Sequence, residues 1–120
     1  MKKNMHMARR RMSHVIDELY TALFRLGGEE VELRLRKEEN GLRLMARGDF
    51  LPEHLSQVER MAEMLQPAVR NRALVETYWE LAGGDQYTSD SELSLVGQML
   101  DEAKVEILDG EVKMDLYLGF

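Results

Sequence analysis

The chain has 120 residues, of which 44% are hydrophobic and 32% are charged, and its formal net charge is −6. This length suits a single two-layer core, so residues 1–120 are expected to form one domain. The chain has no cysteine, which excludes disulfides and thiolate chemistry, and its acidic balance argues against nucleic acid as the main ligand.

His6, His14 and His54 share no metal-ligand spacing, so we expect neither a metal nor another cofactor. No segment approaches the roughly 18 consecutive apolar residues of a membrane-spanning helix. The N-terminus is basic but has no apolar stretch behind it, unlike a secretory signal. The sequence therefore predicts a cytoplasmic protein that does not contact the membrane.

Residues 12–26 have the apolar periodicity of a helix, which Gly27 and Gly28 are expected to end. The apolar face has a residue at every third or fourth position: Met12, Val15, Leu19, Leu23 and Leu26. Ahead of it, residues 1–11 form a basic N-terminal extension, of which residues 7–11 can lengthen the helix backward.

Residues 31–36 alternate apolar and charged side chains, which is the periodicity of a β-strand. In residues 42–47, Leu42, Leu44 and Ala46 alternate with Arg43, Met45 and Arg47 on the return strand. Asn40-Gly41 lies between the two segments and is a turn dipeptide that favours positive φ. The pair is predicted to form a hairpin with one apolar and one charged face, so the sheet is covered on one side only.

Pro52 is well placed as the first residue of a second helix. The predicted buried stripe of that helix consists of four apolar residues: Leu55, Val58, Met61 and Leu65. Pro67 breaks or restarts the helix, and residues 69–81 suit a third helical segment. Residues 86–91 are polar and are expected to form a loop.

Residues 92–101 return to helical spacing, and the chain closes with a second hairpin. Val105 and Ile107 mark its first strand, Asp109-Gly110 its turn, and residues 112–118 its second strand. The predicted fold is α+β: a two-layer sandwich with helices on one face of a mixed sheet made from two β-hairpins.

Two segments at opposite ends of this frame carry short motifs. The first helix contains Glu18-Leu19, then Arg25 and Gly27 directly ahead of a strand, and residues 93–95 (Leu-Ser-Leu) lead into the closing hairpin. In this order the segments resemble the N box and the glycine-rich box of the GHKL superfamily of ATPases, which includes histidine kinases, gyrases and the small anti-sigma-factor kinases. The resemblance covers most of the chain, from about Met12 to Leu118.

The resemblance implies a nucleotide site that has lost its main ligands. Glu18 and Arg25 match the family pattern, but the asparagine that holds magnesium falls at Ala22. The aspartate that binds the adenine amino group falls at Ala46, beside a retained Gly48.

The three glycines of the family's phosphate loop fall at Asp90, Glu92 and Ser94. Glycines let backbone N–H groups approach a phosphate closely, whereas Asp90 and Glu92 bring negative charge to it. A methyl group at Ala46 cannot accept a hydrogen bond from adenine, and Ala22 offers magnesium no oxygen. Together these changes predict a vestigial site without catalysis.

The leading hypothesis is a non-catalytic pseudo-ATPase that acts as a protein-interaction or regulatory module in bacterial-type signalling. Its expected partner is a protein, such as a sigma factor or another signalling protein, and homodimerisation through the first helix is a further expectation. Two enzymatic alternatives stay open. One is a divergent ATP-binding protein kinase that uses Glu18, Asp49 and Asp90 in shifted roles, and the other is phosphotransfer through His14.

Overall fold

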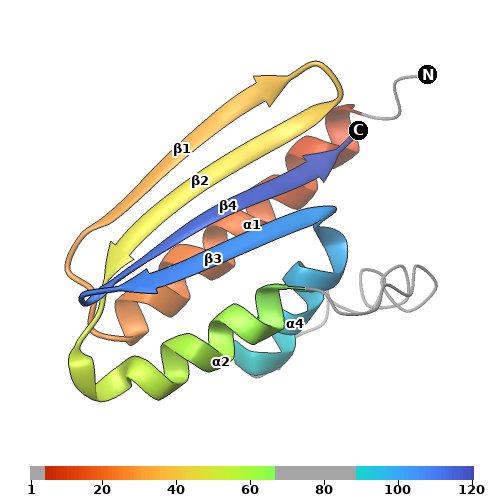
Figure 1. The fold of residues 1–120 in the computed structure, drawn as a ribbon. Coiled ribbons are helices and arrows are strands. Elements are labelled where there is room, and N and C mark those ends of the chain that lie inside the picture. Colours follow the sequence, from red (N-terminus) through yellow and green to blue (C-terminus); the bar gives the residue numbers. More distant parts are fainter. Residues whose placement is uncertain (1–4, 67–88) are drawn as a thin grey trace.

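The computed structural model of the chain describes residues 5–66 and 89–120. Helices lie on one side of a four-stranded sheet (Figure 1). In chain order the elements are α1 (Met5–Arg25), β1 (Val31–Glu38), β2 (Gly41–Asp49), the 3₁₀ turn η1 (Pro52–His54), α2 (Leu55–Leu65), α4 (Ser89–Met99), β3 (Glu102–Leu108) and β4 (Glu111–Gly119). The predicted third helical segment, residues 69–81, lies outside the described residues.

The strand order is β1-β2-β4-β3, and all three neighbouring pairs are antiparallel. The prediction of a mixed sheet was therefore wrong for the part of the chain that the structure describes. The end of β2 lies beside the β3–β4 turn, where the Phe50 N–H donates to the Gly110 carbonyl oxygen. The chain then returns to the other end of the sheet before β3 begins. For that reason β3 runs in the direction of β2, and β4 between them is antiparallel to both.

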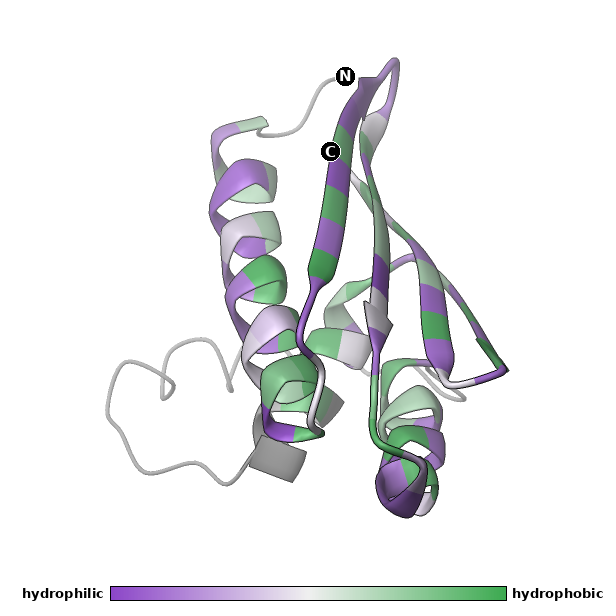
Figure 2. Cartoon of the chain, turned by 90° about the vertical axis from the view of Figure 1, so that its left-hand side faces the viewer, coloured by the Kyte–Doolittle hydropathy of each residue, from purple (hydrophilic) through white to green (hydrophobic). Residues whose placement is uncertain are grey.

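The two predicted hairpins and their alternation are confirmed, and Figure 2 shows hydrophobic and hydrophilic residues alternating along the strands. The helix-facing side of the inner strands is buried and apolar: Leu42, Leu44, Ala46, Val112, Met114, Leu116 and Leu118. The other side of the sheet, which we call the open face, carries most of the strands' charged side chains and is covered by no described helix. Within residues 5–66 and 89–120, no helix has both the length and the apolar character needed to cross a membrane.

The helices begin at different residues from those predicted. α1 starts at Met5 because Ala8 is buried and continues the apolar stripe by one turn, so residues 5–11 belong to this helix. Pro52 begins η1, and α2 follows from Leu55, whose side chain is exposed. The other three residues of the predicted α2 stripe are buried as expected. α4 begins at Ser89, so the last part of the predicted 86–91 loop is helical.

The first hairpin turn also differs from its prediction. Glu38 pairs with Gly41, so the turn residues are Glu39 and Asn40, neither of which has positive φ. Gly41 belongs to β2, where an added Cβ would lie 2.6 Å from the Leu118 carbonyl oxygen on β4. The glycine is therefore needed for close strand approach. Positive φ occurs instead in the second hairpin turn, at Asp109 and Gly110.

Candidate functional site

The interface of α1 with β2 is where the resemblance places part of a nucleotide site. Ala22 on α1 and Ala46 on β2 are buried and belong to one apolar core. A Cβ added to Gly48 would lie 3.2 Å from Leu23 Cδ1, and Leu23 is itself fully buried. Ala22 and Ala46 thus lie in the same apolar core, and Leu23 packs against Gly48 between the helix and the strand.

Glu18 and Arg25 lie on α1, at the positions four before and three after Ala22. Glu18 is half-buried, and Arg25, the last residue of the helix, is exposed. The helical spacing places both on the same side of α1 as Ala22. These two predicted site residues are therefore near the α1–β2 interface, but the side chains that line that interface are aliphatic.

Asp90, Glu92 and Ser94 are all part of α4. α4 packs against α1 and α2. Only the first four N–H groups of a helix lack an intrahelical acceptor, and Ser94 is the sixth residue of α4. Its N–H is consequently committed to the helix, so the three positions do not form the open loop that a phosphate cradle requires.

Asp49, which the kinase alternative uses in a shifted role, occupies the end of β2. Its Oδ1 accepts the N–H groups of Glu29 and Glu30, at N···O distances of 2.9 and 3.1 Å. These backbone hydrogen bonds lower the pKa of Asp49 below its ordinary value of 3.8. The carboxylate therefore ties the loop after α1 to the end of β2, which is a structural role.

Replacing Asp49 with asparagine is expected to lower the melting temperature at neutral pH, because the neutral amide is a weaker acceptor for two N–H groups. The folded-state pKa of Asp49 is depressed, so its stabilisation is present above the unfolded value of 3.8 and is lost as the pH falls through the folded pKa. Thermal melts at pH 7 and at about pH 2 should show a difference between wild type and variant that vanishes in acid. Glu59→Gln, at an exposed position of α2, is the control. A difference that persists unchanged in acid would contradict the assignment.

His14 is half-buried on α1. The described parts of the chain contain no cluster of three or more His, Asp or Glu residues placed to hold a metal ion. The phosphotransfer alternative would use this histidine at its position on α1.

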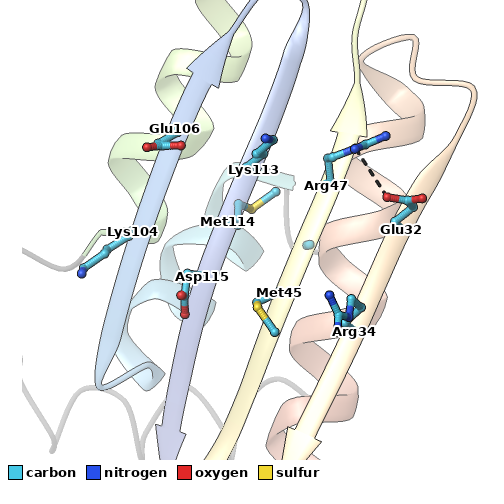
Figure 3. A pocket seen from close by; sticks show the side chains of 10 residues that line it. Glu32, Arg34, Met45, Arg47, Lys104, Glu106, Lys113, Met114 and Asp115 are labelled. Carbon is cyan, nitrogen blue, oxygen red and sulfur yellow. Dashed lines mark ion pairs between the residues drawn. The ribbon is translucent and has the colours of Figure 1, made fainter.

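The open face of the sheet contains a hollow of about 540 Å³ that sequence reasoning missed (Figure 3). Met45 on β2 lies among charged side chains from all four strands. The hollow is lined by four cations (Arg34, Arg47, Lys104 and Lys113) and three carboxylates (Glu32, Glu106 and Asp115). Alternating charges in the strand sequences predicted an uncovered face, but the hollow depends on how the strands are ordered.

The strand register arranges these charges in two rows across the sheet. One row reads Glu32, Arg47, Lys113, Glu106, and the next reads Arg34, Met45, Asp115, Lys104. In the first row Arg47 Nε lies 3.4 Å from Glu32 Oε1. Both signs of charge are interspersed, so the hollow is not a cationic groove.

Arg43 links carboxylates of β1 and β4 on the part of the open face nearest the first hairpin turn. Its Nε donates to Glu38 Oε2 at 2.9 Å and its Nη1 donates to Asp115 Oδ1 at 2.6 Å. The guanidinium carbon lies 5.0 Å from the centroid of the Tyr117 ring. These carboxylates raise the pKa of Arg43, while Arg43 and Arg36 lower the pKa of Glu38. The network fixes Asp115, which also lines the hollow.

The fold and the open face define a class: a small α+β domain with one helix-covered and one uncovered sheet face. Comparisons with protein-family models, curated proteins and solved structures find no match to this chain.

Proposed function

We propose that this chain is a non-catalytic protein-interaction module of the cytoplasm, a GHKL-type pseudo-ATPase that serves in signalling. The observation that carries the proposal is the packing at the α1–β2 interface. Leu23 packs directly against Gly48, and Ala22 and Ala46 lie in the same apolar core. An adenine ring held there would need a buried acceptor, and these side chains supply none.

The open face supports binding of a protein in preference to a nucleic acid. A phosphate backbone favours a surface of one sign, whereas each row across this sheet contains both cations and carboxylates. Met45 offers a flexible apolar contact in the lining of the hollow. A partner protein with its own mixed charges can match such a surface and gain specificity from it.

Calorimetric titration of the chain with Mg-ATP and with Mg-ADP tests the vestigial site. We expect no binding heat at ligand concentrations up to roughly 1 mM. A dissociation constant in the micromolar range would contradict the proposal and would favour the kinase alternative that uses Glu18, Asp49 and Asp90.

A capture experiment from the native cytoplasm tests the open face. The double variant Met45→Glu/Lys113→Glu changes one apolar and one charged residue of the hollow, and Glu59→Lys on α2 is the matched control away from it. We expect a partner that is retained by wild type and by the control but lost by the double variant. Equal capture by all three proteins would exclude the open face as the binding surface.

A further inference from the structure

The outer edge of β1 is available for strand pairing. The strand order places β1 and β3 at the two edges of the sheet, so the outer backbone groups of each lack a strand neighbour among the described residues. α2 contacts β3 and lies along that side of the sheet (Figure 1). No described helix lies beyond β1, so this edge is the more accessible of the two.

β1 also has an apolar side chain that the described parts of the chain leave largely exposed. Val31, Leu33 and Leu35 form the helix-facing row of this strand, opposite Gly48, Ala46 and Leu44 of β2. The first two are partly buried and pack against the core, whereas Leu35 is 53% exposed. A neighbouring strand with an apolar residue opposite Leu35 would cover it.

We propose that a second copy of this chain pairs with β1, antiparallel, about a two-fold axis at Leu33. A two-fold axis perpendicular to the sheet pairs the two β1 strands antiparallel, and each residue lies opposite a residue on the same face of the sheet. The residue numbers of every opposing pair then add up to the same total. With Leu33 opposite its own counterpart, Glu32 faces the partner's Arg34 and Val31 faces the partner's Leu35. The two sheets then join into one continuous antiparallel sheet.

Charge complementarity selects this register. Both Glu32–Arg34 contacts have opposite sign, and just before the strand Glu30 and Glu29 come opposite the partner's Arg36 and the partner's Lys37. Arg34 has no ion-pair partner elsewhere among the described residues. Opposite charges directly across a strand pair are favourable and like charges are unfavourable.

The neighbouring registers lack this complementarity. Centring the axis on Glu32 sets that glutamate against the partner's Glu32. Centring it on Arg34 sets that arginine against the partner's Arg34. Centring it on Leu35 pairs Arg34 with the partner's Arg36, and Glu32 with the partner's Glu38. Only the axis at Leu33 combines opposite charges on the open face with an unbroken apolar row on the helix face.

Dimerisation through β1 would join the open faces of the two copies into one larger surface. Glu32 and Arg34 line the hollow of each copy and lie next to the joining edge, so two hollows would lie on one continuous sheet. A partner could then engage both copies together. The dimer does not depend on the proposed loss of nucleotide binding, since the positions of the vestigial site lie on α1, β2 and α4 and none lies on β1.

Charge reversal at the joining edge tests the dimer by sedimentation velocity of the full chain. Glu32→Arg alone sets an arginine against the partner's Arg34, and Arg34→Glu alone sets a glutamate against the partner's Glu32. Each single variant is expected to weaken self-association roughly tenfold or more. The double variant Glu32→Arg/Arg34→Glu, and an equimolar mixture of the two single variants, should both restore dimers. Lys104→Glu on β3 should leave the dimer intact.

Cysteine cross-linking tests the register, since the chain has no cysteine of its own. Leu33→Cys would place two thiols opposite each other at the axis, and a disulfide-linked dimer is expected under mild oxidation. Leu35→Cys is the control, because its counterpart lies four residues away along the paired strands. A monomeric wild-type chain at about 100 µM would overturn the proposal, because a stable dimer binds more tightly than that. So would a dimer that responds only to Lys104→Glu, or a disulfide that forms in the Leu35→Cys variant but not in the Leu33→Cys variant.

Discussion

Replacing Leu23 with alanine is expected to lower the free energy of unfolding by about 2–5 kcal/mol. Leu23 is fully buried and packs between α1 and Gly48 of β2. Truncation removes its transfer free energy and leaves a cavity that the flanking backbone can close only in part. Urea denaturation followed by circular dichroism measures the loss.

The neighbouring Phe24→Ala is the matched control, since it removes a larger side chain from the outside of the same helix. Phe24 is 49% exposed and meets the Tyr20 ring edge-on, at a centroid distance of 6.4 Å. Its loss is expected to cost about 1 kcal/mol or less. Equal losses for the two variants would contradict the packing of α1 on the sheet.

The Leu23→Ala variant also bears on the vestigial site. The space it opens borders Gly48 and lies in the apolar core that also contains Ala22 and Ala46. An apolar cavity of this kind stays dry and accepts small apolar molecules. The variant should therefore gain no affinity for Mg-ATP, and calorimetry on the folded variant checks this.

Replacing Gly97 with alanine is expected to destabilise the fold by about 1–3 kcal/mol, although alanine is the better helix former by about 1 kcal/mol. An added Cβ would overlap the carbonyl oxygen of Met64 and would lie 3.1 Å from the Leu65 Cα. Both atoms belong to the backbone of α2, so the overlap can be relieved only by moving one helix away from the other. Chemical denaturation gives the change in unfolding free energy.

Ser13→Ala is the control that measures the effect of helix propensity without the contact between α4 and α2. Ser13 is exposed on α1, so its replacement gains propensity without meeting a neighbour. We expect a slight stabilisation of about 0.5 kcal/mol or less. A Gly97→Ala variant as stable as Ser13→Ala would mean that α2 and α4 are not in close contact at this point.

Local periodicity explains which features of the fold were predictable. The first hairpin was predictable because Val31, Leu33 and Leu35 alternate with charged residues, and a half-buried strand has a period of two whatever its neighbours are. The α1 stripe was found for the same reason with a period of 3.6. The start of α1 at Met5 was missed because Ala8 gives only a weak apolar signal among arginines.

For the candidate site, the sequence could predict only which nucleotide-binding side chains are missing. Ala22 and Ala46 could be seen from the sequence to lack oxygen ligands, and the structure adds that both are buried in the core. The role of Asp49 could not be seen, because its two N–H partners are 19 and 20 residues away along the chain. The hollow was likewise missed, because its lining comes from four strands that meet only after the sheet is ordered.

By itself, the sequence determined two amphipathic hairpins, the apolar faces of the helices and the absence of thiol chemistry, because each follows from residue type and spacing within a short segment. The tertiary structure alone decided that β4 lies between β2 and β3, that Gly41 and Gly97 are positions of close backbone approach, and that Met45 lines a hollow among charged side chains. These features depend on contacts between segments far apart in the chain. Such contacts form only when the apolar faces of the helices and of the sheet are buried against each other.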